Sequence, residues 1–551
     1  MTGNKKTAGR IHEIGSGIWL SIATCFMLFL YAPLELLFTN QDEFWFDVYI
    51  LTPIMFTIFA AACIVSIAVF LVLRKLDKKI YRIGLAVYFI AFLCLYIQGN
   101  LLTAGLPSLD GKPIDWSLYT AEKVQSAILW MLITILVGFA FWKVQQDLFE
   151  KVVKGISVGM TLMLCVTLLT LAVTGQGFER KPGLGVTTRN MFQMSKDTNF
   201  VILLLDAVNG QTMYDIIASD TDYQDIFTDF TFYSNMMGVY PATKYSVPYI
   251  LSGQWFENQT SFREYEAEAY ASSPFLASME EEGYQLGVYE ADLQANDRGK
   301  ERFENVLPSR RGIGNKLMFA KWQIQMTGFK YAPWSLKKHT FVNPNDFNKA
   351  KIPPEGEELF TSSNSEFYDT LLQEELSYTD AKCFRFIHIV GGHPPFIYNE
   401  EAEEIPEEEG SYEESIKSSL TITREYLDKL KAGGVYDHSV IIVMSDHGFH
   451  MGDYSERQNP VFFVKGINEK HEFNVSDAPV SYVDLQEAYQ RLLSGADSDQ
   501  IFDWKSGEER ERRYLFYEYS EEERMIEYMQ PGRADDTEAM YETGKVYMRA
   551  K

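Results

Sequence analysis

The chain has 551 residues, a formal net charge of −25 and five cysteines, and its apolar residues are concentrated before residue 175. This length exceeds one average domain, and the acidic balance supplies no basic stripe to neutralise phosphates, which argues against nucleic-acid binding. Four of the cysteines lie in the apolar part. Cys383 is therefore alone in the polar part, which excludes a disulfide within that part.

The first 175 residues contain five apolar segments, each roughly 20 residues or longer and thus long enough to cross a hydrocarbon core. Buried helices of soluble proteins carry a polar stripe, and these segments carry almost none. We therefore predict that residues 1–175 form a transmembrane domain of five helices. The predicted spans are Gly17–Phe38, Val48–Leu73, Ile80–Leu101, Ser126–Val144 and Val152–Thr174.

Basic residues flank alternate ends of these spans. Because cytoplasmic loops carry an excess of lysine and arginine, the pattern predicts a cytoplasmic N terminus. Everything after Thr174 is then extracellular or periplasmic, in a multi-pass protein of the cell membrane. The basic residues are Lys5, Lys6, Arg10, Arg74, Lys75, Lys78, Lys79, Lys151 and Lys154.

Residues 176–197 are weakly periodic and are predicted to be a linker, followed by a catalytic domain over residues 198–551. Strand-like and helix-like stretches alternate in this domain, which indicates an α/β fold with a mainly parallel central sheet. The strand-like runs are Phe200–Leu205, Tyr284–Tyr289, Cys383–Val390, Val440–Met444 and Val461–Val464.

One segment of this domain, Lys316–Trp334, is rich in aromatic residues, methionine and lysine. Two interpretations fit this composition. The segment lies against the membrane surface, or it is a buried insertion helix. Neither interpretation assigns it a function.

Two apolar runs end in acids, NFVILLLDA over Asn199–Ala207 and VIIVMSDHG over Val440–Gly448. Such runs are typical of buried parallel strands, whose carboxyl ends meet at the edge where open α/β folds build their sites. Asp206, Asp446 and His447 would then lie together and could hold one divalent cation. Oxygen-dominated ligation with a single nitrogen favours Mn²⁺ or Zn²⁺, with Mg²⁺ as a further option.

The segment PATKYSVPYILSG, Pro241–Gly253, places Thr243 at the start of a predicted helix. Exposed N–H groups and the helix dipole at that position favour an anionic group in transfer. A threonine at a helix start is commonly an N-cap, which is the alternative interpretation. Beside two strands that end in acids, we predict instead that Thr243 is the nucleophile and a metal ligand.

A histidine in a rigid loop, His393 in IVGGHPPF, follows another strand-like run. It is predicted to be catalytic, either protonating a leaving group or hydrogen-bonding the transferred phosphoryl group, and the alternative is a purely structural loop histidine. His388 and His438 are assigned to structure. Four weaker candidates for substrate binding, each of a kind found more often at the surface or behind a site, are His450, Lys244, Arg457 and Asn459.

Together these motifs resemble the sulfatase branch of the alkaline phosphatase superfamily, and VSYVDLQEAYQRLLSG (Val480–Gly495) is similar to the helix that closes that domain. Five membrane spans before such a domain also resemble lipoteichoic acid synthases and lipid A phosphoethanolamine transferases. The resemblance implies that His393 contacts substrate. It also implies a set of metal ligands, which are Asp206, Thr243, Asp446 and His447.

The chain departs from the sulfatase pattern at the nucleophile. Sulfatases carry C-x-P-S-R, in which a cysteine or serine becomes formylglycine, whereas Thr243 cannot become the aldehyde and Val247 replaces the arginine. Ala207 stands where sulfatases have a second acid. T-x-x-S-V-P is instead similar to the nucleophile motif of phosphoethanolamine transferases, although those enzymes usually have glutamate at the position of Asp206.

The predicted function is a membrane-anchored, metal-dependent phosphotransferase that works through a phospho-threonine intermediate. Its donor would be a membrane phospholipid that supplies glycerol phosphate or phosphoethanolamine, and its acceptor a surface glycan or glycolipid. One alternative is a membrane-tethered hydrolase of phosphate or sulfate esters. A second alternative is a surface-assembly protein without activity.

Overall fold

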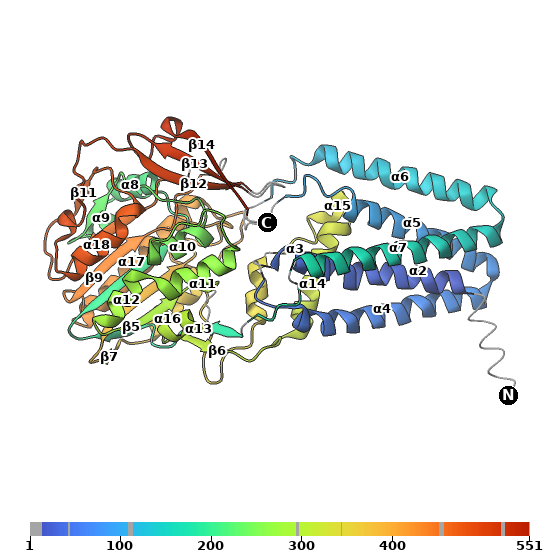
Figure 1. The fold of residues 1–551 in the computed structure, drawn as a ribbon, viewed down its shortest axis with the longest axis horizontal. Coiled ribbons are helices and arrows are strands. Elements are labelled where there is room, and N and C mark those ends of the chain that lie inside the picture. The colour runs from blue at the N-terminus through green and yellow to red at the C-terminus, as the bar shows by residue number, and fades with distance from the viewer. Residues whose placement is uncertain are drawn as a thin grey trace. The chain divides into compact units, whose positions relative to one another are not determined.

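The computed structural model describes residues 14–41, 44–107, 109, 114–175, 177–181, 183–293, 297–342, 344–450, 457–518 and 524–549. Two compact units are present. The first unit combines the chain up to Gly183 with Arg311–Ile352, and the second combines Leu184–Arg310 with Pro353–Lys551. Figure 1 shows long helices in the first unit and a sheet with covering helices in the second. The sequence pattern, which predicted one continuous domain over residues 198–551, did not anticipate that residues 311–352 join the first unit.

Five helical segments of the first unit are long and apolar enough to cross a membrane, and each overlaps one predicted span. Large apolar side chains lie exposed along them, including Ile64, Leu136 and Val166 at 69%, 66% and 66% exposure. Such a surface suits contact with lipid rather than water. The helices are α2 (Gly15–Phe26), continued by the π-helical turn η1 (Met27–Tyr31) and by α3 (Ala32–Thr39), then α4 (Val48–Leu76), α5 (Lys78–Asn100), α6 (Thr120–Lys143) and α7 (Gln146–Thr174).

Aspartates begin two of these helices. Asp47 Oδ1 accepts hydrogen bonds from the N–H groups of Tyr49 and Ile50 at 3.0 and 3.2 Å, and Asp77 caps α5 in the same way. These caps satisfy N–H groups that a helix leaves unpaired at its start. Of the basic residues behind the predicted orientation, Lys5, Lys6 and Arg10 lie outside the described residues, so the orientation stays a prediction.

The aromatic segment after residue 315 forms α14 (Lys316–Tyr331) and α15 (Trp334–Lys337), which pack within the helical unit. Phe319 and Met326 join the same apolar cluster as side chains of α3 and α4. Tyr331 lies against Gly99 of α5 so closely that a Cβ there would be 2.3 Å from its ring. Lys330 Nζ lies 2.6 Å from Glu35 Oε2 of α3. The structure therefore favours the buried insertion helix over a helix lying on the membrane surface.

The second unit is built on a seven-stranded sheet in the order β11-β4-β10-β9-β3-β8-β5. Four adjacent strands of this sheet, β9, β3, β8 and β5, run parallel to one another, and β10 runs antiparallel to β9 and β4. The predicted strand-like runs are confirmed as strands, and the predicted mainly parallel α/β fold is confirmed with them. The strands are β3 (Asn199–Leu205), β4 (Thr231–Tyr233), β5 (Tyr284–Tyr289), β8 (Lys382–Ile389), β9 (Ser439–Met444), β10 (Phe462–Lys465) and β11 (Asn474–Ser476).

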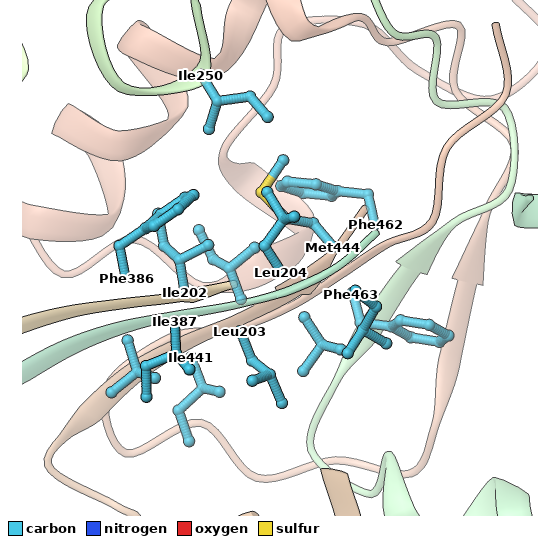
Figure 2. Close-up of a cluster of buried hydrophobic side chains, with 14 of the residues drawn as sticks. Ile202, Leu203, Leu204, Ile250, Phe386, Ile387, Ile441, Met444, Phe462 and Phe463 are labelled. Atoms are coloured by element: carbon cyan, nitrogen blue, oxygen red, sulfur yellow. The ribbon is translucent and has the colours of Figure 1, made fainter. Parts of the chain in front are cut away.

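The central strands are apolar on both faces because helices cover both faces. Figure 2 shows Ile202, Leu204 and Phe386 on one side of the sheet, where Ile250 of α10 (Thr243–Ser252) packs over them. Leu203, Ile387 and Ile441 lie on the opposite side (Figure 2). The sheet is thereby fixed in register, and the helix that begins at Thr243 is held against one face of it.

The remaining elements surround this sheet. The helices are α8 (Gly210–Ser219), α9 (Thr221–Ile226), α11 (Phe262–Ser272), α12 (Pro274–Glu281), α13 (Asp297–Arg302), α16 (Asn364–Gln373), α17 (Tyr412–Ala432) and α18 (Leu485–Leu493), with 3-10 turns η5 (Tyr482–Asp484), η6 (Ser498–Gln500) and η7 (Thr537–Ala539). The 3-10 turn η3 (Pro344–Ala350) belongs to the helical unit. Three smaller sheets pair β1 (Leu184–Val186) with β6 (Val306–Pro308), β2 (Gln193–Ser195) with β7 (Ser377–Thr379), and β12 (Arg512–Glu518) with β13 (Arg524–Gln530) and β14 (Tyr541–Met548).

Candidate metal centre and nucleophile

Asp206 and Asp446 follow neighbouring parallel strands at the same level of the sheet. Leu204 of β3 pairs with Met444 of β9, so the residues two positions further along leave the sheet together. Side chains alternate between the two faces of a strand, so residues two apart share a face. That face carries Leu204 and is covered by α10 (Figure 2). The register thus brings both carboxylates under the helix that begins at Thr243.

Asp206, Asp446 and His447 each offer a ligand atom, and these atoms all lie within 4.8 Å of one another. His447 Nε2 lies 3.3 Å from Asp446 Oδ2 and 3.7 Å from Asp206 Oδ1. Asp446 and His447 are buried, and Asp206 is almost so. The three residues predicted from the two strand ends are therefore brought together.

The donor set fits a divalent cation. Asp446 Oδ1 accepts a hydrogen bond from Ala207 N at 3.1 Å, whereas buried Asp446 Oδ2 accepts none from the described residues. His447 Nδ1 lies 2.6 Å from Gly448 O, which only accepts, so Nδ1 carries the proton and Nε2 the lone pair. An unsatisfied carboxylate oxygen facing an imidazole lone pair is a metal-binding arrangement rather than a stable polar contact.

The pKa shifts of the site also favour a bound cation. Burial, followed by the negative charge of Asp206, raises the pKa of Asp446. Burial would also raise the pKa of Asp206, but the imidazoles of His393, His388 and His447 hold that pKa below its usual range. Burial lowers the pKa of His447, which favours the neutral, ligating form. Two carboxylates out of water need a positive charge beside them, which a divalent cation supplies.

Thr243 is the first residue of α10, and Ala242 is the N-cap, with extended backbone and no side-chain cap among the described contacts. The Thr243 hydroxyl instead donates toward Asp206 Oδ1 at 3.4 Å. The N-cap interpretation of Thr243 is therefore wrong. Gly253 ends the helix in the left-handed conformation, at φ 70°.

Comparison with known protein families places this geometry in context. The model of the sulfatase family matches residues 198–492, more than half of the chain. The chain belongs to the sulfatase family. The matched range includes Thr243 and all three clustered ligands. No curated protein matches the chain.

Solved structures similar to this sulfatase-family chain include three bacterial proteins. An alkaline phosphatase superfamily protein from Vibrio parahaemolyticus is 13% identical over 66% of this chain and 81% of its own, at a TM-score of 0.36. A phosphonate monoester hydrolase from Silicibacter pomeroyi is 13% identical over 63% and 88%, at 0.34. A putative sulfatase from Bacteroides fragilis is 13% identical over 62% and 86%, at 0.35. Because these identities and TM-scores are low, the assignment of the site in this chain rests on the geometry of the site itself.

His393 of this sulfatase-family site stands in a loop that is tied to the backbone of Asp206. Gly392 N donates to Asp206 O at 2.8 Å, and Asp206 N donates to Ile389 O at 3.1 Å. Gly391 has a φ of 60°, and a Cβ there would lie 2.5 Å from Asp206 N. Only glycine allows the backbone of residue 391 to come this close to Asp206. The Gly-Gly pair therefore sets the position of His393 relative to Asp206.

The four weaker candidates occupy different environments. Lys244 Nζ lies over the rings of Tyr245 and Phe262, at 5.3 and 5.0 Å, and His450 is exposed at the end of a described stretch. Arg457 is buried and donates to Pro241 O, at 3.4 Å, in the nucleophile segment.

Asn459 is hydrogen-bonded to the backbone of two neighbouring segments, and its predicted substrate contact stays a prediction. Its Oδ1 accepts from Gln211 N at 3.1 Å, and its Nδ2 donates to Met236 O at 2.9 Å. Gly210 packs against it so tightly that a Cβ there would lie 2.8 Å from Oδ1. The side chain thus joins the start of α8 to the segment after β4.

Two residues that the sequence pattern did not place in the site lie beside it. His388, assigned to structure from the sequence, has its Nε2 3.5 Å from Asp206 Oδ2. Glu290 lies in direct contact with His388 Nδ1. A polar residue two positions after Phe386 in the apolar run FRFIHIV is the signal that could have found His388, because residues two apart in a strand share a face.

Proposed function

We propose that this protein is a membrane-anchored phosphotransferase that moves glycerol phosphate or phosphoethanolamine from a phospholipid to a hydroxyl of a surface glycan or glycolipid. The observation that carries the proposal is the placement of Thr243. Its hydroxyl is directed toward Asp206 at the start of α10, and it caps no helix. A hydroxyl that lies at a helix N-terminus beside buried carboxylates, and that is not used as a helix cap, has the surroundings of an activated nucleophile.

The choice of threonine supports phosphoryl transfer over sulfate hydrolysis through formylglycine. Threonine carries a methyl group on Cβ, so it cannot be converted to the aldehyde that the cysteine or serine of sulfatases yields. Val247 also replaces the arginine of that motif and is buried. The chain therefore keeps acids and a histidine at Asp206, Asp446 and His447, while it lacks the second acid after Asp206 and the sulfatase nucleophile.

In the first half-reaction, the Thr243 hydroxyl releases its proton to solvent as Oγ1 bonds to phosphorus, and the bond from phosphorus to the diacylglycerol oxygen breaks. The departing oxygen takes a proton, for which His393 is the donor we assign. The N–H groups at the start of α10 face the developing negative charge on the phosphoryl oxygens. In the second half-reaction, an acceptor hydroxyl attacks the phospho-threonine and gives its proton to His393, while the bond from phosphorus to Thr243 Oγ1 breaks and Oγ1 takes a proton from solvent.

Asp206, Asp446, His447 and Thr243 would hold a divalent cation, for which Mn²⁺ and Zn²⁺ are the candidates and Mg²⁺ a further option. When bound, it supplies Lewis-acid stabilisation of charge and lowers the pKa of an oxygen ligand. The chain contributes the arrangement of these side chains, the closed loop that places His393 and the burial that excludes water.

The five apolar helices support a lipid donor, because an enzyme anchored in the bilayer meets its lipid substrate at high effective concentration. In this proposal the second unit lies outside the cytoplasm, where surface glycans are found. Lys244, which lies in the nucleophile segment, and Arg457, which donates to Pro241 O of that segment, are the side chains we assign to the acidic substrate, with His450 as a third.

A second candidate is a membrane-tethered hydrolase of phosphate or sulfate esters, favoured by the match to the sulfatase family. Water would then take the place of the glycan hydroxyl in the second half-reaction. The two candidates share the nucleophile and differ in the acceptor.

The test is to incubate the purified full-length protein with headgroup-labelled phosphatidylglycerol or phosphatidylethanolamine and Mn²⁺ or Zn²⁺, and to locate the label by mass spectrometry. We expect the label on Thr243, and we expect Thr243→Ala to abolish it. Thr260→Ala is the matched control, since Thr260 is exposed and its hydroxyl donates to Ser261 O at 3.3 Å. Turnover of aryl sulfate or aryl phosphate without any lipid-derived adduct would overturn transfer in favour of hydrolysis.

A further inference from the structure

The parallel strands bring two further ionisable residues into line with the proposed metal centre. Leu204 of β3 pairs with His388 of β8, and Tyr289 of β5 pairs with Ile387 of β8. Glu290, the residue after Tyr289, therefore stands opposite His388. The strand order is β9-β3-β8-β5. One edge of the sheet therefore carries, in this order, the ligands after β9 and β3, the imidazole of His388 and the carboxylate of Glu290.

The contacts along this row are specific. His388 Nδ1 contacts Glu290 Oε2, and His388 Nε2 faces Asp206 Oδ2 at 3.5 Å. His388 and Glu290 are only 4% and 6% exposed. His388 Nε2 has no hydrogen-bond partner among the described residues. A buried imidazole nitrogen aimed at a carboxylate oxygen in this way is unlike an ordinary core histidine, whose polar atoms are satisfied.

The two oxygens of Asp206 face different groups. Oδ1 lies toward the Thr243 hydroxyl and His447 Nε2, at 3.4 and 3.7 Å, whereas Oδ2 lies toward His388. Asp206, Asp446 and His447 form the group of mutually close ligand atoms found in the described part of the chain, and His388 is not a member. Ligands of one small cation at about 2.1 Å lie within roughly 4.2 Å of each other, so His388 acts on Asp206 and not on the same ion.

We propose that His388 and Glu290 are positioning residues of the metal centre. Glu290 accepts from Nδ1–H and fixes the ring, and Nε2–H donates to Asp206 Oδ2 in the metal-loaded protein. Asp206 is thereby held with Oδ1 toward the cation and Thr243. Metal ligands are commonly oriented by hydrogen bonds from residues behind them. The loss of such a residue typically costs about 10–100-fold in metal affinity. The inference rests on the proposed metal site but not on the identity of the lipid or the acceptor.

Two isosteric substitutions separate the two ring nitrogens. The amide nitrogen of glutamine reaches the place of Nε2, and that of asparagine reaches the place of Nδ1. His388→Gln therefore keeps a donor for Asp206 Oδ2, whereas His388→Asn keeps only the donor for Glu290. His438→Asn is the matched control, because His438 is exposed in a turn before β9.

The measurement is the dissociation constant of Mn²⁺ for the full-length protein, from the free-ion signal in electron paramagnetic resonance, together with the melting temperature with and without Mn²⁺. We expect His388→Asn to weaken Mn²⁺ binding about 10–100-fold and His388→Gln to recover most of the loss. A residue with a merely structural role would lower the melting temperature of the metal-free protein and leave the stabilisation by Mn²⁺ unchanged.

Wild-type affinity in His388→Asn, or equal weakening in the glutamine and asparagine variants, would overturn the inference. If His388→Asn fails to fold, Glu290→Gln decides in its place, with the same readout and a loss of affinity expected. A wild-type protein that binds neither Mn²⁺ nor Zn²⁺ would overturn the proposed metal site itself. Normal metal binding without a lipid-derived adduct would overturn only the proposed transfer.

Discussion

The polar side chains of the helical unit and those of the proposed metal centre in the sulfatase unit differ in how they are paired. In the helical unit, Glu35 and Lys330 form an ion pair of opposite charges at 2.6 Å, and Tyr331 Oη donates to Asn100 Oδ1 at 3.3 Å. In the sulfatase unit, carboxylates of like charge are buried together, and Asp446 Oδ2 accepts no hydrogen bond from the described residues. Paired groups hold elements together, whereas an unpaired cluster costs stability and is retained for chemistry.

The same contrast assigns a role to Glu35, an acid in the first apolar span. Its carboxylate is paired with Lys330 of the insertion helix α14, so it helps to hold α14 against the helices. An acid in a membrane segment is a functional candidate by default, but the ion pair with Lys330 gives Glu35 a structural explanation.

The largest expected effect comes from breaking the charged cluster. Asp446→Asn removes one negative charge from the buried ligand set, so we expect Mn²⁺ affinity to fall more than about 100-fold, beyond the loss typical of a residue behind the ligands. Labelling of Thr243 should disappear with it. Equilibrium dialysis with metal analysis measures the affinity. Asp437→Asn, at an exposed position, is the control, and unchanged metal content in Asp446→Asn would contradict the assignment.

The second effect concerns the loop that joins His393 to Asp206. Gly391→Ala places a Cβ 2.5 Å from Asp206 N at a φ of 60°, so the loop must move or strain. We expect a loss of more than about 1 kcal/mol in unfolding free energy, together with weaker metal binding. Gly283→Ala has a similar φ of 86° and open space, so it isolates the backbone strain. Equal losses in both variants would show that contact with Asp206 is unimportant.

The third effect tests the packing of the insertion within the helical unit. Gly99→Ala introduces a Cβ 2.3 Å from the Tyr331 ring, so α14 must shift away from α5, which typically costs about 1–3 kcal/mol. Gly138→Ala in α6 has nothing within 4 Å and serves as the matched control. Thermal unfolding in detergent measures both, and similar melting temperatures for the two variants would count against this packing.

The smallest effect is a pH dependence in the helical unit. Burial lowers the pKa of Lys337 to about 7, while its ammonium donates to Lys330 O at 2.9 Å. Between that value and its ordinary pKa the unfolded chain binds more protons, so stability should rise as pH rises from about 7 toward 10. Lys337→Met should flatten this rise in the melting temperature, whereas Lys338→Met, at an exposed neighbour, should not.

Much of the architecture could be predicted because local composition reflects the surroundings of a segment. Uninterrupted apolar runs predicted the five helices, and shorter apolar runs predicted β9 and β3 with their terminal acids and β8 with the loop of His393 after it. The clustering of Asp206, Asp446 and His447 followed, since parallel strands deliver their carboxyl ends to one edge. The three-stranded sheet of β12, β13 and β14 was not predicted, because antiparallel pairing near a chain end depends on contacts that leave little local signal.

The sequence by itself determined the kinds of segment and the chemistry at their ends, because periodicity and residue type act over a few neighbouring positions. Tertiary structure alone decided three things: that residues 311–352 return to the helical unit, that Ala242 and not Thr243 occupies the N-cap position of α10, and that His388 and Glu290 stand behind Asp206. Each depends on residues far apart in the chain. Only the strand order and the register bring such residues within reach of one another.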